Sequence, residues 1–469
     1  MSIIRRLALI LAFSFFVLSL GLVYWQVVQA DELVNHPANR RLILMEGKVA
    51  RGGIFDRNGE VLAQSIEADG STRREYPKGE MMEPLLGYAT LQHGSAGLES
   101  ALAELLLGQK YGTPGQQLQR FFDLPRQGND VVLSLDAGLQ KTAYQGLQGK
   151  TGSVVALDPR TGQVLALASQ PSYSPNQLEE NWAQIIQQTG SPLQNHAFSL
   201  FPPGSIMKVV TSKALFTAGI DTTDLFHCEG SVIINGQRIS EQNGKEHGWV
   251  NYNLALADSC NTYFSVQAVE SGARRFLAAA RDFGFGKAIP FELPITRSSI
   301  TNTAGGGPIP DTLDENMLAA SAFGQGQVLV SPFHMALITA GIANHGVMMK
   351  PYIVERVLAE QNKVTYQAHP EPWLTALTEE QAKKITSAMI TAVNEGTAAP
   401  GAISSVQVAA KTGSAEPGGD VLTHAWYIAF APAEAPRIAV VVMIENGGTG
   451  GGAAAPIARN LIIQALSGK

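Results

Sequence analysis

The longest apolar stretch of the chain lies near its N-terminal end, at residues 7–25. Two arginines, Arg5 and Arg6, come directly before it. About twenty apolar residues are enough for a helix to cross a lipid bilayer, and basic residues at its start favour an orientation that leaves this end in the cytoplasm. We therefore predict a short cytoplasmic tail over 1–6, a membrane-spanning helix over 7–28 and an extracytoplasmic remainder in a single-pass protein of the cytoplasmic membrane.

A cleaved signal peptide is the alternative for this segment, because Val28-Gln-Ala30 resembles a small-residue cleavage site. The apolar stretch is longer than the core of a usual signal peptide. Tyr24 and Trp25 also fit the aromatic residues that anchor a helix at a membrane interface. These features favour a retained helix.

Short apolar segments separated by turn residues follow over residues 29–129. Asp56-Arg-Asn-Gly59 lies between two of these segments and predicts a β-hairpin, and a helical pattern covers residues 101–107. No group of residues suited to catalysis stands out here. We interpret 29–129 as a small non-catalytic platform domain.

A different pattern of strand-like and helix-like segments begins at residue 130 and continues to residue 469. Two apolar segments flank the turn Pro159-Arg-Thr-Gly162, which predicts an antiparallel hairpin. Three further strands and a closing helix are predicted at residues 406–410, 424–430, 437–444 and 454–466. Strands at both ends of the region enclose a helical middle, so we predict an α+β domain over 130–469.

Composition narrows the class of protein. The 469 residues are 45% hydrophobic and 16% charged, which is enough for two or three domains with cores of their own. The chain has 34 basic and 40 acidic residues and a net charge of −6, so it offers no basic field for a polyanion. We expect no nucleic-acid partner.

The nine histidines are scattered along the chain, and none has the sequence spacing to cysteine or acidic residues that metal motifs show. We therefore expect neither a metal nor a cofactor. His247 and His424 are candidates for contacts with a site, although ordinary loop or strand residues are the simpler interpretation. Cys228 and Cys260, the only cysteines, are either a disulfide or two small buried thiols, and the sequence leaves both open.

The first candidate for chemistry is Ser205-Ile-Met-Lys208, which follows the rigid turn Phe201-Pro-Pro-Gly204 and opens an apolar helical pattern. Residues three apart share a helical face, so the Lys208 amine can lie beside the Ser205 hydroxyl. Burial lowers the pKa of a lysine, and a neutral amine next to a hydroxyl is a general base for a nucleophile. A serine followed by a lysine at this spacing is common, however, and needs support from elsewhere in the chain.

Two more motifs supply that support. Ser259-Cys-Asn261 is a polar cluster in an apolar setting. A helix cap or turn is the simpler interpretation. As a partner of the first motif, however, Ser259 could relay a proton and the Asn261 amide could hold a peptide substrate. Lys411-Thr-Gly413, with Ser414 after it, follows a strand-like stretch. It offers an ammonium group, hydroxyls and an approachable backbone to a carboxylate-ended peptide, whereas a charged edge strand explains Lys411 alone.

In this order the three motifs resemble those of class B penicillin-binding proteins, which are monofunctional peptidoglycan D,D-transpeptidases. Four further segments resemble elements of the same family: Arg51-Gly-Gly-Ile-Phe-Asp-Arg-Asn-Gly59, Gly97-Leu-Glu99, Phe323-Gly-Gln-Gly326 and His424-Ala-Trp426. The resemblance runs from about residue 50 to the end. It implies a penicillin-binding transpeptidase or β-lactamase-like domain, with a five-stranded antiparallel sheet and a helical subdomain, after a dimerisation-like platform.

The resemblance also implies roles. Ser205 would attack the bond between the last two D-alanines of a stem peptide and form an acyl-enzyme, with Lys208 as base and Ser259 as proton relay. The oxyanion would rest on backbone N–H groups of Ser205 and Ser414. The remaining substrate-binding residues would be Asn261, Lys411, Thr412, Gly413 and Ser414.

Stem peptides and β-lactams are the ligands that this resemblance implies, and a polytopic lipid II polymerase is the partner that it implies for the single helix. A D,D-carboxypeptidase or a β-lactamase would use the same motifs and let water deacylate Ser205. A largely structural subunit of cell-wall synthesis is a third alternative. Two features favour a transpeptidase over a β-lactamase: the platform signature, and the long spacings between the three motifs.

Overall fold

The computed structural model describes residues 2–29, 49–68, 71–111, 113, 115, 126–301, 308–416, 418 and 421–467. Parts of the expected platform, 29–129, therefore lie outside the described residues. The chain divides into two compact units, Met1–Ala50 and Arg51–Lys469.

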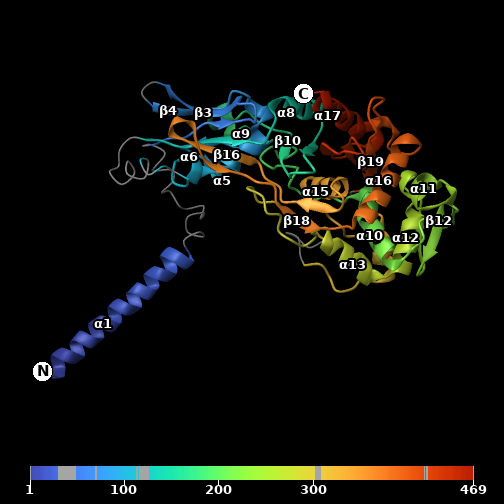
Figure 1. Cartoon of the computed structure of the whole chain (residues 1–469), viewed down its shortest axis with the longest axis horizontal. Coiled ribbons are helices and arrows are strands. Elements are labelled where there is room, and N and C mark those ends of the chain that lie inside the picture. The colour runs from blue at the N-terminus through green and yellow to red at the C-terminus, as the bar shows by residue number, and fades with distance from the viewer. Residues whose placement is uncertain are drawn as a thin grey trace. The chain divides into compact units, whose positions relative to one another are not determined.

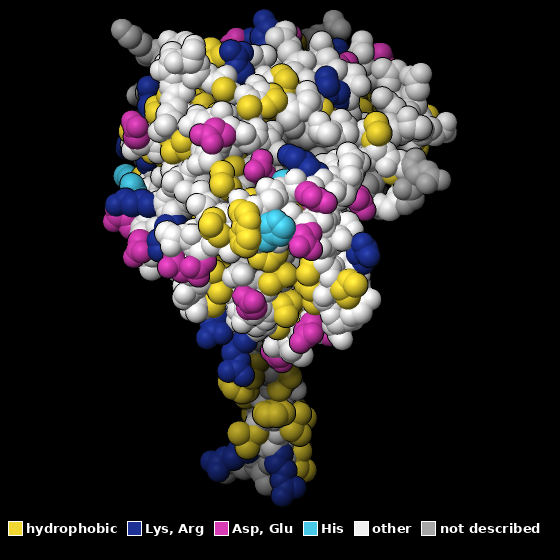
Figure 2. Space-filling model, turned by 90° about the vertical axis from the view of Figure 1, so that its right-hand side faces the viewer, with side chains coloured by type: hydrophobic (Ala, Val, Ile, Leu, Met, Phe, Trp, Pro, Cys, Tyr) yellow, Lys and Arg dark blue, Asp and Glu magenta, His cyan; other side chains and the backbone are white. Residues whose placement is uncertain are grey.

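Among its described residues, the first unit contains one long helix. Helix α1 (Ser2–Val23) continues into a π-helical turn, η1 (Tyr24–Val28). Residues Ile3–Val28 have a mean hydropathy of 2.5, and their side chains are exposed along the helix (Figure 2). The helix is long and apolar enough to cross a membrane, as predicted for 7–28.

Two sheets organise the second unit (Figure 1). The first has six strands in the order β17-β16-β8-β2-β3-β4. Their bounds are β2 (Ile54–Phe55), β3 (Val61–Ala68), β4 (Ser71–Glu75), β8 (Asp130–Leu133), β16 (Val354–Ala359) and β17 (Lys363–Gln367). The β2–β3 hairpin closes at Asp56-Arg-Asn-Gly59, where Gly59 N donates to Asp56 O, and confirms the turn predicted there. The expected boundary at residue 130 coincides with the start of β8, which pairs in parallel with β2.

Segments of the platform signature meet beside this sheet. Glu99 pairs with two buried guanidinium groups: Nε of Arg51 lies 3.0 Å from Oε2, and Nε of Arg74 donates to Oε1 at 2.7 Å. Arg51-Gly-Gly and Gly97-Leu-Glu99 therefore contribute to one ionic cluster, together with Arg74. The helix predicted at 101–107 is instead two short ones, α5 (Gly97–Ala101) and α6 (Ala103–Leu106), because the backbone departs from helical geometry at Leu102.

The second sheet has five antiparallel strands in the order β10-β9-β21-β20-β19, as the family resemblance implied. Their bounds are β9 (Gly152–Leu157), β10 (Val164–Gln170), β19 (Ala409–Ala415), β20 (His424–Ala431) and β21 (Ile438–Ile444). The strand predicted at 406–410 begins later, because Val406 closes a local bridge with Ile403, and it continues to Ala415 through pairing with β20.

Alternate residues of this sheet face two different cores. Val155 and Val441 pack with the wholly buried helix α15 (Pro332–Ala343) on one face. Val154 and Val440 pack on the other face with α8 (Ala137–Gly146) and α17 (Ala455–Ser467), the closing helix that the sequence predicted (Figure 1). β19 is an edge strand, so one side of its backbone is open.

A helical subdomain lies beside β19, which contacts its helix α16 and the turn η4 before its helix α10. It contains α10 (Lys208–Ala218), α11 (Tyr252–Ala257), α12 (Asn261–Ser271), α13 (Ala273–Asp282), α14 (Glu315–Ala322) and α16 (Glu379–Asn394). Two small two-stranded sheets belong to it: β11 (Phe226–Cys228) with β14 (Gly248–Val250), and β12 (Ser231–Ile234) with β13 (Gln237–Ser240). The other described elements are β1 (Val49–Ala50), η2 (Gly79–Met81), α4 (Glu83–Leu86), β5 (Ala89–Thr90), β6 (Gly94–Ser95), β7 (Arg126–Gln127), η3 (Pro175–Gln177), α9 (Leu178–Ile185), η4 (Gly204–Met207), η5 (Gln242–Gly244), β15 (Val347–Met349), η6 (Glu360–Asn362), β18 (Pro372–Thr375), η7 (Ala399–Gly401) and η8 (Gly450–Ala454).

Candidate active site

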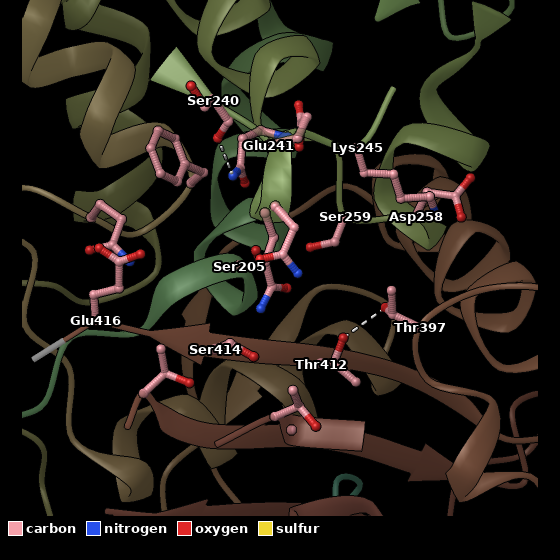
Figure 3. A pocket seen from close by; sticks show the side chains of 18 of the residues that line it. Ser205, Ser240, Glu241, Lys245, Asp258, Ser259, Thr397, Thr412, Ser414 and Glu416 are labelled. Atoms are coloured by element: carbon pink, nitrogen blue, oxygen red, sulfur yellow. Dashed lines mark hydrogen bonds between the residues drawn. The ribbon is translucent and has the colours of Figure 1, made fainter. Parts of the chain in front are cut away.

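Ser205 lies in the 3₁₀ turn η4, directly before α10. Gly204 precedes it with φ +57°, and a Cβ on Gly204 would lie only 2.9 Å from Ser414 O. Glycine is needed there because the backbone is left-handed and another backbone approaches closely. The turn thus places the Ser205 hydroxyl at the helix start and beside β19, and Figure 3 shows it facing the same space as Ser259, Thr412 and Ser414.

Lys208 is fully buried, and its Nζ contacts four oxygen atoms. The distances are 3.0 Å to Ser205 Oγ, 2.6 Å to Ser259 O, 3.2 Å to Ser259 Oγ and 2.8 Å to Asn261 Oδ1. Burial lowers the pKa of Lys208 to about 8, against the opposing effect of Glu241. The carbonyl and amide oxygens can only accept hydrogen bonds. A neutral amine that donates its two N–H groups to them keeps its lone pair for the Ser205 hydroxyl.

Ser259 and Asn261 come from the turn between α11 and α12. Ser259 has φ +64°, an uncommon conformation for a residue with a side chain, and Asn261 begins α12. The Asn261 amide Nδ2 donates to Ser240 O at 3.2 Å, which leaves Oδ1 for Lys208. The turn therefore brings a hydroxyl, a carbonyl and an amide oxygen to one amine.

The third motif lies within β19 rather than after it. Lys411 is fully buried, and its Nζ donates to Ser259 Oγ and to Thr412 O, both at 2.9 Å. Burial, and then the nearby Lys208, hold the pKa of Lys411 well below its usual value. Thr412 Oγ1 lies 2.7 Å from Thr397 Oγ1, as the dashed line in Figure 3 marks. The Ser259 hydroxyl thus lies between two buried amines.

Contacts with three other segments fix the position of η4 and the residues before it. A Cβ on Gly413 would lie 3.0 Å from Pro203 O, and one on Gly324 would lie 2.0 Å from Gly204 O. Trp426 Nε1 on the neighbouring strand donates to Pro202 O at 3.0 Å. The segments Phe323-Gly-Gln-Gly326 and His424-Ala-Trp426, which the sequence related to the same family, therefore support the turn that carries Ser205.

These elements border a groove of about 1130 Å³. Of the eight predicted site residues, five line the groove and three lie behind its wall. The lining residues are Ser205, Ser259, Asn261, Thr412 and Ser414, and the residues behind are Lys208, Lys411 and Gly413. The structure brings all three motifs to one place.

Several groove residues were not predicted. Thr397 and Glu241 line the groove, and Glu241 accepts from the backbone N–H of Asn261 at 2.8 Å. Neither residue lies in one of the three motifs. The sequence signal for Glu241 was only that an acidic residue comes before an apolar helical segment, and Thr397 had no signal. The glycine-rich segment at 447–452 also lines the groove, through Gly450, Gly451 and Gly452. Gly450 packs closely on the sheet, since a Cβ there would lie 2.0 Å from Trp426 O. Of the two candidate histidines, His247 lines the groove, whereas His424 Nδ1 instead accepts from Asn446 N at 3.1 Å.

Cys228 and Cys260 are free and buried thiols. Their sulfur atoms lie with Glu241 and His247, and the ligand atoms of the four residues are all within 4.8 Å of one another. Sequence spacing gave no metal motif at any histidine, whereas the fold brings His247 close to two cysteines and one glutamate. The four residues come from separate loops, which a spacing rule does not detect.

Comparisons with known proteins show the family of this chain. A family model for the penicillin binding protein transpeptidase domain matches residues 152–463, and one for the penicillin binding protein A dimerisation domain matches residues 51–131. The chain therefore belongs to the penicillin-binding proteins with a transpeptidase domain, and the dimerisation-like module places it in class B, as its motifs indicated.

Within that family the chain is similar to the peptidoglycan D,D-transpeptidase PbpA of Mycobacterium tuberculosis, with 36% identity over 99% of each chain. It is 29% identical to the peptidoglycan D,D-transpeptidase MrdA of Acinetobacter baumannii, over 81% of this chain and 64% of that one. The solved penicillin G acyl-enzyme complex of penicillin-binding protein A from M. tuberculosis has a TM-score of 0.81 and 33% identity, and covers 89% of this chain and 99% of that one.

Proposed function

We propose that this protein is a membrane-anchored peptidoglycan D,D-transpeptidase that works through a Ser205 acyl-enzyme and is blocked by β-lactams. The observation that carries the proposal is the Lys208 amine, buried at 3.0 Å from Ser205 Oγ with two acceptor-only oxygens on its other sides. Acyl-enzyme complexes of penicillin-binding protein A from M. tuberculosis, which has the same fold, support it.

In the proposed acylation, neutral Lys208 accepts the Ser205 proton while Oγ attacks the carbonyl carbon between the last two D-alanines. The N–H groups of Ser205 and Ser414 stabilise the oxyanion. Ser259, within reach of both buried amines, passes a proton to the nitrogen of the departing D-alanine. An amine of a neighbouring stem peptide then attacks the acyl-enzyme and restores Ser205.

Substrate binding is assigned to the groove side of the motifs. Thr412 and Ser414 lie two apart on β19 and so face the same side, where their hydroxyls can bind the terminal carboxylate. Gly413 permits the close approach of η4. Lys411 supports this side from behind the wall, where its amine donates to the Ser259 hydroxyl, and Asn261 aligns the peptide at the opposite side.

The domain and membrane assignments are part of the same proposal. We assign 29–129 to the platform, 130–469 to the catalytic domain and 7–28 to a single membrane helix with residues 1–6 in the cytoplasm. Proteolysis of spheroplasts should then degrade the catalytic domain without lysis. A polytopic lipid II polymerase would contact the helix; a variant with an unrelated apolar helix should lose co-purification with it.

The test of the function is labelling of the full chain in detergent with a fluorescent penicillin, beside the Ser205→Ala variant. Wild type should label and keep the label through a chase, and the variant should not label. Rapid loss of label would favour a β-lactamase, and absent labelling of folded wild type would favour a structural subunit.

A second assay separates the remaining alternative. A peptide that ends in D-Ala-D-Ala is incubated with the wild type and an acceptor amine, and the products are separated by mass. A joined product supports transpeptidation. A peptide that is only shortened by one D-alanine would instead indicate a D,D-carboxypeptidase.

A further inference from the structure

The Thr397 hydroxyl has no role in the reaction proposed above, yet it connects the second motif with the third. Thr397 lies in the segment between α16 and η7 and lines the groove. Its Oγ1 donates to Ala257 O at 3.1 Å and lies 2.7 Å from Thr412 Oγ1 (Figure 3). Ala257 ends α11, directly before the turn that carries Ser259. One side chain therefore contacts both the helix end of the second motif and the substrate strand.

The backbone around residue 397 is held in place without this hydroxyl. Thr397 N also donates to Ala257 O, at 3.1 Å. A Cβ on Gly396 would lie 2.5 Å from the same oxygen, and one on Gly451 would lie 3.0 Å from Thr397 O. Close backbone contacts thus fix the segment from two sides. The hydroxyl is a second donor to a carbonyl that already has a backbone partner.

The two threonine hydroxyls each have only one proton to donate. A backbone carbonyl can only accept, so while Thr397 donates to Ala257 O it can only accept from Thr412. The Thr412 proton then points at Thr397 and not into the groove. A carboxylate can also only accept, so Thr412 cannot donate to one in this arrangement.

We propose that Thr397 is a positioning residue for recognition of the terminal carboxylate of the substrate, an inference that rests on the function proposed above. When the carboxylate enters the groove, the Thr397 hydroxyl turns from Ala257 O to Thr412 Oγ1. Thr412 then donates its own proton to the carboxylate. No proton leaves its oxygen, and Ala257 O keeps its backbone donor, so the exchange leaves no buried acceptor without a partner.

This exchange makes the pair of hydroxyls selective for an anion. Thr412 is only 7% exposed, so a bound ligand leaves water little access to its hydroxyl. A hydroxyl that accepts a hydrogen bond is a better donor, and a carboxylate is the acceptor that gains most from it. We therefore expect Thr397 to affect ligands that carry the carboxylate and not ligands that lack its charge.

The first test compares benzylpenicillin with its methyl ester, which lacks this charge, on the full chain in detergent. Thr397→Val keeps the size of the side chain and removes the hydroxyl. It should lower the second-order acylation rate constant of benzylpenicillin at least about tenfold, because a hydrogen bond to a charged group loses its support. The rate constant of the ester should stay within about twofold of wild type. Thr397→Ser, which keeps the hydroxyl, should restore the preference for benzylpenicillin.

A second test asks whether Thr397 acts through Thr412, and it uses benzylpenicillin alone. Thr412→Val removes the hydroxyl that would contact the carboxylate. In that background, Thr397→Val should slow acylation by less than about twofold further, because the two changes remove one shared interaction. Mass spectrometry of the acyl-enzyme follows the rates in both tests.

Thr391→Val is the matched control. Thr391 lies in α16, where its hydroxyl donates to Ser387 O one turn earlier, and it is not among the residues that line the groove. This variant should acylate with both ligands at wild-type rates. Thermal unfolding of all variants checks that each is folded.

Three results would overturn the proposal. An unchanged rate of Thr397→Val with benzylpenicillin would show that the hydroxyl is not needed. Equal losses with benzylpenicillin and the ester, or a full loss that persists in the Thr412→Val background, would show that Thr397 acts on the fold of the turn instead. A wild type that benzylpenicillin does not acylate would contradict the proposed function itself, and this inference with it.

Discussion

Lys208 has a side chain that water normally solvates, but here it is fully buried among oxygen atoms. A charged amine at this depth loses its hydration, and a second buried amine, Lys411, contacts the same Ser259 hydroxyl. Burial favours the neutral form of Lys208, and burial together with Lys208 favours the neutral form of Lys411. Above about pH 8 the nucleophile therefore meets a lone pair rather than an ammonium group.

This protonation behaviour predicts a pH dependence. Because the pKa of Lys208 is lowered to about 8, the amine is protonated below that pH and cannot accept the Ser205 proton. The acylation rate should rise about tenfold per pH unit below this value and level off above it. Stopped-flow acylation by a fluorescent penicillin measures the profile. A rate that is flat across this range would contradict the assigned base.

Replacing Lys208 tests the same role directly. Lys208→Ala should slow acylation by at least about a hundredfold, because no other amine contacts Ser205 Oγ among the described hydrogen bonds. Lys213→Ala, on the same helix and paired with Asp282 instead, is the matched control and should acylate at the wild-type rate. Circular dichroism of both variants checks the fold. Normal labelling of Lys208→Ala would refute its role.

The turn η4 and the edge strand β19 depend on each other for their positions. Gly204, Gly324 and Gly413 allow backbones to approach where any Cβ would collide, and the Trp426 indole holds the turn from the next strand. The distance between the nucleophile and the substrate strand is therefore set by backbone contact. Side-chain changes elsewhere on these elements should matter less.

A pair of glycine variants isolates this contact. Gly324→Ala should strongly slow acylation, because its Cβ would lie 2.0 Å from Gly204 O and must push the Ser205 turn away. Gly219→Ala has almost the same φ, +81° against +79°, but open space around the new Cβ. It should cost only roughly 1–2 kcal/mol in the free energy of unfolding and leave acylation unchanged. Equal acylation by the two variants would show that the contact does not position Ser205.

The second unit is tied together by strands from distant parts of the sequence. The six-stranded sheet joins residues 54–75 with 130–133 and 354–367, so the platform region and the catalytic region share hydrogen bonds. Beside it, Glu99 holds two buried guanidinium groups. We expect this unit to lose its platform and its catalytic sheet together on heating.

The ionic cluster predicts where stability is concentrated. Glu99→Gln leaves two buried guanidinium groups with less negative charge, which should cost roughly 3–5 kcal/mol and lower the Tm by several degrees. Glu60→Gln is the control, because Glu60 pairs with Lys78 at the surface and should change stability by less than about 1 kcal/mol. Differential scanning calorimetry compares them. Similar Tm values for both variants would contradict a structural role for the cluster.

Turns and motifs were predictable because their signals are local. Asp56-Arg-Asn-Gly59 and Pro159-Arg-Thr-Gly162 form hairpins through residues that favour turns in any context. Both ends of β19 were misplaced, because a local bridge at Val406 delays its start and pairing with β20 extends it to Ala415. The break at Leu102 likewise depends on packing that the helical pattern does not contain.

From the sequence alone follow the apolar N-terminal helix, the α+β class, the family and the eight residues of the three motifs. These depend on composition, short periodic patterns and spacing within a few residues, which the chain carries without folding. Only the folded chain decides that Lys411 lies behind the groove, that Glu241 holds the start of α12 and that two thiols meet His247. Those relations join loops far apart in the sequence, and only packing of the sheet, the turns and the helices sets the distances between them.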